Sequence, residues 1–216
     1  MGAASSEGIR EESMKVLAIT SNPESHSLTD AVGKAFVEGA AAGGAQVELL
    51  DLYAEAFNPV YTLADREHYL DRGAVPDDVV ALQRRLASAD VIALVFPVYW
   101  YTMPAMVKGL FDRVICRGFA YGREGLPGAL AGKTVRILAL TGGSEDWYRS
   151  SGMDKALEFQ ICDRTFRHYC SVEDVSLHYI GDLSMGDDSQ EARDAAAGQL
   201  GKIALMGESL ARRKER

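Results

Sequence analysis

The stretch from Asp90 to Cys116 constrains the fold more than any other part of this 216-residue sequence. Residues 90–97, DVIALVFP, are apolar and β-branched, which is typical of a strand buried on both faces of a parallel sheet. Apolar residues then recur at helical spacing over residues 103–116, with Thr102 as the expected N-cap and Pro104 in the first turn. Three aromatic residues separate the two elements: Tyr99, Trp100 and Tyr101. We expect them outside the carboxyl end of the strand, where open α/β sheets bind ligands.

Composition and charge exclude several classes of protein. The content of 47% hydrophobic and 25% charged residues is ordinary for a globular chain, and the net charge of −8 argues against a nucleic-acid binder. No apolar run approaches the ~20 residues that span a bilayer, so no membrane insertion is expected. The three cysteines, Cys116, Cys162 and Cys170, are too few and too irregularly spaced for a disulfide framework or a zinc motif. They favour a reducing cytoplasm and predict no metal site.

Strand patterns and helix patterns alternate five times along the sequence. The strands are expected at 14–20, 46–52, 90–97, 134–141 and 171–180, and the later helices at 76–88, 103–116, 152–169 and 190–212. This alternation predicts a doubly wound α/β domain, a five-stranded parallel sheet in the order 2-1-3-4-5 with helices on both faces. Residues 14–212 then form a single domain. Residues 1–13 lack the apolar core of a secretory signal and are expected to be a disordered tail.

The loop after the first expected strand, SNPESHSLTD, is rich in hydroxyl groups. Hydroxyls beside the backbone N–H groups of a helix N-terminus suit a phosphate. Serine and threonine are also common helix caps, and Ser27 with Asp30 fits a variant of the capping box. The residues alone therefore leave phosphate binding and plain capping equally open. Neither GxGxxG nor GxxxxGK[ST] is present.

Four separated pieces of the sequence resemble the flavodoxin-like NAD(P)H:quinone oxidoreductases, the DT-diaphorase type and its bacterial relatives. The pieces are DLYAEAFNPVYTLAD from Asp51, PVYWYTMPAMVKGLFDRV from Pro97, GFAYG from Gly118 and TGGSEDWY from Thr141. They keep the order of the family, and the likeness covers most of the chain from residue 14 to about residue 210. The resemblance implies a flavodoxin-like fold, a flavin cofactor, and NADPH or NADH as the electron donor.

The resemblance also implies that the flavin lies on the loops after the first, third and fourth strands. The first loop would hold the phosphate, and the flat ring would lie between the other two, with Trp100 and Tyr101 packed along it. Backbone N–H groups at Gly142 and Gly143 could approach the N1–C2 edge, which becomes negative on reduction, and Tyr148 could donate there. Without the resemblance, the glycine pair reads as an ordinary turn. The expected cofactor residues are Ser21, Asn22, His26, Ser27, Leu28, Thr29, Pro97, Val98, Tyr99, Trp100, Tyr101, Thr141, Gly142, Gly143 and Tyr148, of which Gly142, Gly143 and Tyr148 are also the expected catalytic groups.

One position departs from the family pattern. In the mammalian enzymes, a histidine that follows the tyrosine matched by Tyr148 helps to balance the charge of the reduced flavin. This sequence has Asp154 in that place, and an aspartate stabilises an anion only when it is protonated. We therefore expect Tyr148 and the backbone donors to carry this role without a histidine.

Residues 53–75 form a long polar and aromatic connection, and connections of this length are usually functional. By resemblance, this segment contributes to a homodimer contact and to the neighbouring active site, while Phe119 and Tyr121 line the site of the electron acceptor. In the FAD-binding enzymes a longer segment at this place reaches the adenine of the partner's cofactor. The shorter segment here favours FMN over FAD.

The sequence therefore predicts a cytoplasmic, homodimeric NAD(P)H:quinone oxidoreductase. It would pass two electrons as a hydride from NADPH or NADH through FMN or FAD to a quinone-like acceptor. Two alternatives stay open. One is a flavodoxin-type electron carrier, which the 53–75 connection and the GFAYG loop disfavour. The other is a regulatory flavoprotein subunit of a potassium-efflux system, which shares the GFAYG and TGG elements and is not distinguished by sequence.

Overall fold

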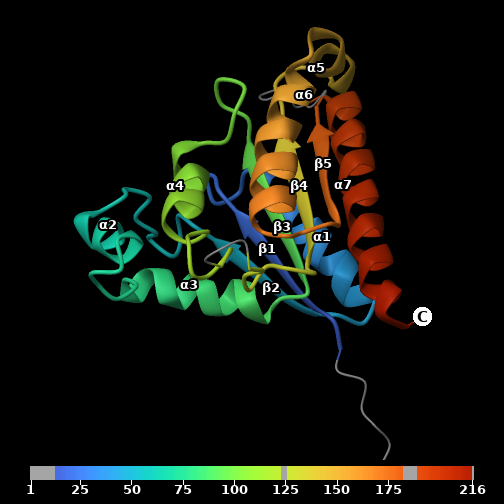
Figure 1. Cartoon of the computed structure of the whole chain (residues 1–216). Helices are drawn as coiled ribbons and strands as arrows, with labels where there is room; N and C mark the ends of the chain where they lie inside the picture. Colours follow the sequence, from blue (N-terminus) through green and yellow to red (C-terminus); the bar gives the residue numbers. More distant parts are fainter. Residues whose placement is uncertain (1–12, 123–125, 182–188, 216) are drawn as a thin grey trace, which may run out of the picture.

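The computed structural model describes residues 13–122, 126–181 and 189–215. Residues 1–12 of the expected tail and most of the expected turn at 181–189 lie outside these ranges. Five parallel strands form one sheet in the order β2-β1-β3-β4-β5, so the predicted fold class and strand order are confirmed (Figure 1). The strands are β1 Lys15–Thr20, β2 Gln46–Asp51, β3 Val91–Pro97, β4 Thr134–Leu140 and β5 Val175–Ile180.

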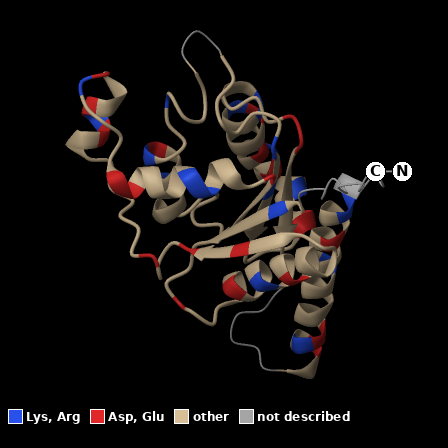
Figure 2. Ribbon diagram, turned by 90° about the horizontal axis from the view of Figure 1, so that it is seen from below, with Lys and Arg blue, Asp and Glu red and all other residues tan. Residues whose placement is uncertain are grey.

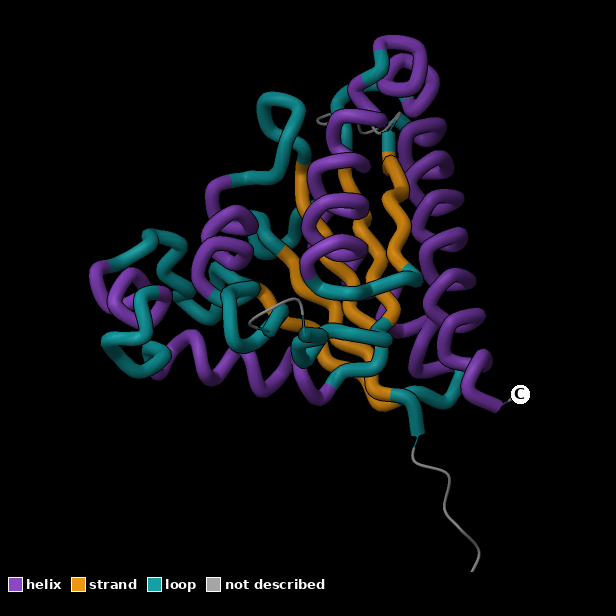
Figure 3. Tube along the Cα trace, viewed as in Figure 1, coloured by secondary structure: helices purple, strands orange, loops and turns teal. Residues whose placement is uncertain are grey.

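Helices cover both faces of the sheet, as a doubly wound fold requires (Figure 3). One face packs against α1 (Leu28–Ala42) and α7 (Gln190–Ala211). The opposite face packs against α3 (Asp77–Ser88), α4 (Ala105–Arg113), α6 (Met153–Glu158) and the π-helix η2 (Phe159–Tyr169). The remaining helices are α2 (Leu63–Tyr69), α5 (Glu145–Ser151) and η3 (Arg212–Glu215).

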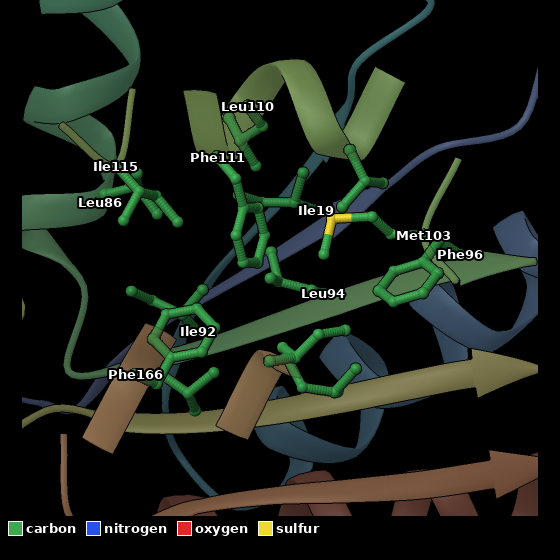
Figure 4. Packing of buried hydrophobic residues seen from close by; sticks show 14 of the residues in the cluster. Ile19, Leu86, Ile92, Leu94, Phe96, Met103, Leu110, Phe111, Ile115 and Phe166 are labelled. Carbon is green, nitrogen blue, oxygen red and sulfur yellow. The ribbon is translucent and has the colours of Figure 1, made fainter. Parts of the chain in front are cut away.

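Strand β3 is buried on both faces, as its apolar sequence predicts. Alternate residues, among them Leu94, point toward α3, α4 and η2, while their neighbours, among them Val95, point toward α1 and α7. Figure 4 shows the first of these clusters, in which Leu86, Phe111 and Phe166 come from three different helices. The central strand therefore packs into both hydrophobic layers. Its position also fixes the position of the aromatic loop that follows its carboxyl end.

Helices α1 and α7 approach each other so closely that their backbones touch at two glycines. A Cβ atom on Gly39 would lie 1.9 Å from the carbonyl oxygen of Ala204, and one on Gly207 would lie 2.2 Å from that of Phe36. Any larger residue at either position would have to push the helices apart. The absence of a side chain there is therefore a requirement of the packing.

The two ends of the described domain lie beside the same turn. The backbone N–H of Gln46 donates to the carbonyl of Met14, just before β1, at 2.8 Å. At the end of α7, the Cβ of Ala211 lies 2.7 Å from where a Cβ on Gly43 would be. Figure 1 shows this pole of the molecule at the bottom, opposite the loop after β3 and helix α5.

The expected N-cap of the helix after β3 is wrong. Thr102 lies in a tight turn, where its N–H donates to the carbonyl of Tyr99 at 3.1 Å and its carbonyl accepts from the Tyr99 N–H at 3.0 Å. Its hydroxyl donates to Gln160 Oε1 at 3.0 Å and is therefore directed to η2. The N-cap position of α4 is Pro104, which provides no side-chain hydrogen bond.

Two predicted segments contain helices that the hydrophobic pattern does not reveal. The 53–75 connection holds α2, which begins at a complete capping box between Thr62 and Asp65. The helix expected over 152–169 is preceded by α5, and Gly152, with φ 77°, separates α5 from α6. These short helices place Asp65 and Tyr148 on regular structure rather than on loops.

Candidate functional site

The loops that follow β1, β3 and β4 meet at one edge of the sheet (Figure 3). The N–H of Ser21 donates to the carbonyl of Val95 at 3.1 Å, and the N–H of Val98 donates to that of Leu140 at 2.8 Å. These bonds extend the strand pairing by one residue on each side of β3. The structure thus brings together the three loops that carry the predicted cofactor residues.

The first loop is held by side-chain hydrogen bonds that leave part of it exposed. Ser27 caps α1, because its hydroxyl accepts from the N–H of Asp30 at 3.2 Å. Asn22 Nδ2 donates to the buried hydroxyl of Thr29 at 3.2 Å. His26 is exposed and Leu28 is half-buried. Ser27 therefore acts as the N-cap of α1 and fixes the loop to the N-terminus of that helix.

Ser21 is the residue of this loop that capping does not explain. Its hydroxyl is buried and has no hydrogen-bond partner among the described residues. A buried hydroxyl without a partner is costly, so this one calls for an explanation outside the described contacts. The same loop leads into the N-terminus of the 15-residue helix α1, and a helix N-terminus is suited to a phosphate.

The second loop holds two aromatic residues in a strained backbone conformation. Trp100 and Tyr101 have φ values of 48° and 62° and are the central residues of the Tyr99–Thr102 turn. Such a turn favours Asn-Gly, and bulky residues there cost about 1–2 kcal/mol each. The side chain of Trp100 is 93% exposed, so core packing does not compensate. Strain of this kind is common at functional sites.

We expect Trp100→Asn to raise the free energy of unfolding by about 1 kcal/mol, because asparagine tolerates the left-handed region. The matched control is Tyr99→Asn, since Tyr99 lies in the same loop with its backbone outside that region. The control should destabilise the protein or leave it unchanged. Urea denaturation of the two variants measures both effects, and an equal change in both would show that the turn carries no strain.

The third loop leads directly into α5. The hydroxyl of Thr141 donates to the carbonyl of Gly143 at 2.8 Å, which closes the turn, and Ser144 caps the helix. A Cβ on Gly142 would meet nothing within 4 Å, so the chain itself does not require a glycine there. Tyr148 is buried on α5, and burial, followed by the neighbouring Tyr101, raises the pKa of its phenol.

Four aromatic rings form a row that links the second loop to the interior. The ring centroids are 6.4 Å apart for Tyr101 and Trp147, 5.2 Å for Trp147 and Tyr148, and 5.2 Å for Tyr148 and Tyr179. Trp147 and Tyr179 are absent from the predicted site. The Trp-Tyr pair that follows the glycines was the available signal for Trp147. For Tyr179 there was none, because it is one of several apolar positions of β5.

Asp154 lies at the buried end of this row. Its Oδ1 atom is buried and has no hydrogen-bond partner among the described residues, and Oδ2 is 3.8 Å from Arg149 Nη1. The hydroxyl of Tyr179 donates to the backbone carbonyl of Asp154 at 3.3 Å. The residue that departs from the family pattern is therefore close to Tyr179, which in turn contacts Tyr148.

The residues predicted for the acceptor site lie apart from the three loops within one chain. Tyr121 lines a cavity beside α2 and α4, with its ring 5.4 Å from that of Tyr169, and Phe119 packs against the hydrophobic core. No lining residue of that cavity belongs to the three loops. Within one chain, Tyr121 therefore does not reach the three loops.

Two further features concern the described residues as a whole. They contain no cluster of three or more His, Cys, Asp or Glu side chains placed to bind a metal ion. None of their helices is long and apolar enough to cross a membrane. Acidic and basic residues are interspersed along the helices (Figure 2).

Sequence comparison places this arrangement among known proteins. A family model described as flavodoxin-like fold matches residues 14–204. An uncharacterized NAD(P)H oxidoreductase of Haemophilus influenzae is 32% identical over 178 residues, which are 81% of this chain and 87% of that protein. The ribosyldihydronicotinamide dehydrogenase [quinone] of Mus musculus is 32% identical over 158 residues, 64% of this chain and 68% of that protein.

Comparison with solved structures gives the same grouping. The NAD(P)H:quinone oxidoreductase from Methanothermobacter marburgensis superposes with a TM-score of 0.82 and 25% sequence identity. The match covers 92% of this chain and 98% of that one. The likeness therefore extends over most of the length of both chains.

Proposed function

We propose that this chain is a flavin-dependent NAD(P)H:quinone oxidoreductase. The chain belongs to the flavodoxin-like fold family and is related to NAD(P)H quinone oxidoreductases. It would take two electrons from NADPH or NADH and deliver them to a quinone or a similar acceptor. The observation that carries the proposal is the convergence of three loops at one sheet edge, with an unpartnered buried hydroxyl on the first. A row of four aromatic rings, which runs from the second loop through α5 to β5, also supports it.

The residues of the three loops fit FMN in chemical character. Ser21, Ser27 and the start of α1 would hold the phosphate, and Tyr101 and Trp147 would pack against the ring system. When bound, the flavin supplies the chemistry, by accepting a hydride and passing both electrons on. The backbone N–H groups near Gly142 would donate to the edge that becomes negative, and no side chain would prevent their approach.

The quaternary state and the choice of flavin rest on the segment between β2 and α3. Large apolar side chains are exposed at five of its positions, namely Tyr53, Val60, Tyr61, Leu63 and Tyr69. Such a concentration on one segment favours a protein interface, and a two-fold dimer would cover it. The shortness of the same segment favours FMN over FAD. The three cysteines are free, which suits a cytoplasmic location.

We expect the purified protein to be yellow, with about one flavin per chain, and to release FMN on heating. Absorbance and chromatography of the released flavin measure this. A flavin-free protein that takes up neither FMN nor FAD would contradict the proposal. A protein that binds flavin but is not reduced by NADPH or NADH would instead be an electron carrier or a regulatory subunit.

We expect Tyr148→Phe to slow reduction of the bound flavin by roughly tenfold to a hundredfold, because a donor to a developing charge contributes about 1–3 kcal/mol. Flavin affinity should be retained, since the first loop is unchanged. Stopped-flow absorbance measures the reduction. The control is Tyr169→Phe, which makes the same change at an exposed position on η2.

Asp154→Ala tests the alternative assignment at the same site. It should leave the reduction rate unchanged or increase it, because it removes a negative charge near Tyr179. The opposite result would reverse the assignment. If the flavin of Tyr148→Phe is reduced at the wild-type rate and the flavin of Asp154→Ala is reduced far more slowly, Asp154 is the functional group.

A further inference from the structure

The end of β5 lies directly against the third loop. Gly181 follows β5, and a Cβ atom there would lie 2.4 Å from the carbonyl oxygen of Gly143 and 2.9 Å from Thr141 Oγ1. It would also lie 3.4 Å from the backbone nitrogen of Glu145, in the first turn of α5. A side chain of any kind at this position would therefore collide with the turn that leads from β4 into α5.

Two hydrogen bonds hold this turn in place. The hydroxyl of Thr141 donates to the Gly143 carbonyl at 2.8 Å, and the N–H of Thr141 donates to the carbonyl of Ile180 at 3.0 Å. The second bond fixes the start of the turn to the residue just before Gly181. Because that bond keeps β5 beside β4, a side chain at position 181 would have to displace the Gly143 carbonyl.

The orientation of the Gly143 carbonyl determines where the next N–H group points. The described residues contain no cis peptide bond, and a trans peptide directs its C=O and its N–H to opposite sides. The Gly143 carbonyl faces the end of β5, so the N–H of Ser144 is directed away from β5. β3 lies on that other side of β4, and the second loop follows β3. The Ser144 N–H is thus directed to the side on which the flavin ring would lie.

Three successive N–H groups of this turn have no acceptor among the described residues. They belong to Gly142, Gly143 and Ser144, none of which is buried. Donors of this kind stabilise a developing charge most strongly when their direction is fixed before the charge appears. The contact with β5 provides that fixed direction.

We propose that Gly181 is a positioning residue for the reaction, and this rests on the proposed function. By carrying no side chain, Gly181 lets the Gly143 carbonyl face β5, and this arrangement directs the N–H groups of the third loop to the flavin edge that becomes negative on reduction. Gly181 itself acts only through the turn and does not touch the flavin. A side chain at position 181 would turn the donors away, which would destabilise the reduced flavin more than the oxidised one.

Gly181→Ala in the flavin-loaded protein tests this role. The equilibrium constant for reduction of the bound flavin should fall at least tenfold, which for a two-electron couple lowers the midpoint potential by about 30 mV. Spectroelectrochemical titration measures the potential. The control is Gly39→Ala, whose Cβ would lie 1.9 Å from the Ala204 carbonyl of α7, so it creates a clash away from the third loop. The control should leave the potential unchanged, and an equal shift in both variants or no shift in Gly181→Ala would overturn the proposal.

Thr141→Val reaches the same peptide through its other contact, and it keeps the proposal falsifiable if Gly181→Ala does not fold. It removes the hydroxyl that holds the Gly143 carbonyl and should lower the potential, whereas Thr141→Ser keeps the hydroxyl and should not. Because both changes act on one peptide, the Gly181→Ala and Thr141→Val shifts should add to less than their sum in the double variant. No shift in Thr141→Val, or strictly additive shifts, would refute the role of the peptide.

A spectrum of the flavin-free protein separates this proposal from the proposed function. Gly181→Ala should shift the amide NMR resonances of residues 142–145, and Gly39→Ala should not. If these resonances shift but the protein takes up no flavin, Gly181 positions the loop and the proposed function fails. If flavin is bound and reduced while the resonances and the potential stay unchanged, the enzyme stands and the role of Gly181 is refuted.

Discussion

Replacing Gly39 with alanine is expected to lower the free energy of unfolding by roughly 3 kcal/mol or more, the upper range for overpacked sites. The new Cβ would lie 1.9 Å from the oxygen and 2.6 Å from the carbon of the Ala204 carbonyl. Both are backbone atoms of α7, so no side-chain rotation can relieve the clash. One of the two helices must move off the sheet, and urea denaturation measures the cost.

The control is the same substitution in the partner helix. Gly198 lies in α7, and a Cβ there would meet nothing within 4 Å. Alanine should therefore stabilise the protein by about 0.5–1 kcal/mol, because it lowers the conformational entropy of the unfolded chain. If Gly39→Ala lowers the free energy of unfolding and Gly198→Ala raises it, the close contact of α1 and α7 is established. If both substitutions raise it, the close contact is contradicted.

Arg113→Ala is expected to cost about 3–5 kcal/mol of unfolding free energy, because it leaves the buried Asp65 carboxylate without its cation. Both side chains are almost fully buried, and their atoms Nε and Oδ2 are 3.0 Å apart. Arg212→Ala is the control, since Arg212 forms an exposed pair with Glu208 and should cost under about 1 kcal/mol. Similar losses of unfolding free energy in the two variants would show that the buried Asp65–Arg113 pair contributes no more stability than an exposed pair.

The pH dependence gives this prediction a second readout. Burial raises the pKa of Asp65, but hydrogen bonds from Thr62 and Arg113 outweigh it, so the pKa lies below its usual value. A carboxyl group of this kind stabilises the fold above its unfolded pKa, and the contribution is lost as the pH falls through the folded pKa. The difference between wild type and Arg113→Ala should therefore shrink below about pH 4. A constant difference down to pH 3 would contradict the ion-pair explanation.

The order of strands and the doubly wound topology were predictable because they depend on local patterns. β3 was recognisable from its apolar run, and the Ser27 cap was visible in the first loop. Helix α2 was missed, although Thr62 and Asp65 form a capping box that could have indicated it. The Thr102 cap was wrong, because a turn with Tyr99 competes for the same residue.

The candidate site was predictable in outline but not in its details. The positive φ of Trp100 depends on the turn that closes around it, and no residue pattern indicated it. The bond between Arg113 and Asp65 joins residues 48 positions apart, and the cavity beside α2 and α4 is lined by residues that are equally distant in the sequence. The roles assigned to the loop residues stay predictions, as does the flavin itself.

Residues 14 and 211 both lie beside the Gly43–Gln46 turn, so the two ends of the domain are close together in space. A short linker could join these two points, and the chain could be opened instead in the exposed stretch at 71–74, giving a circular permutant with the same contacts. The join would lie at the pole opposite the three loops. A second domain fused at this pole would therefore lie away from the three loops and leave them uncovered.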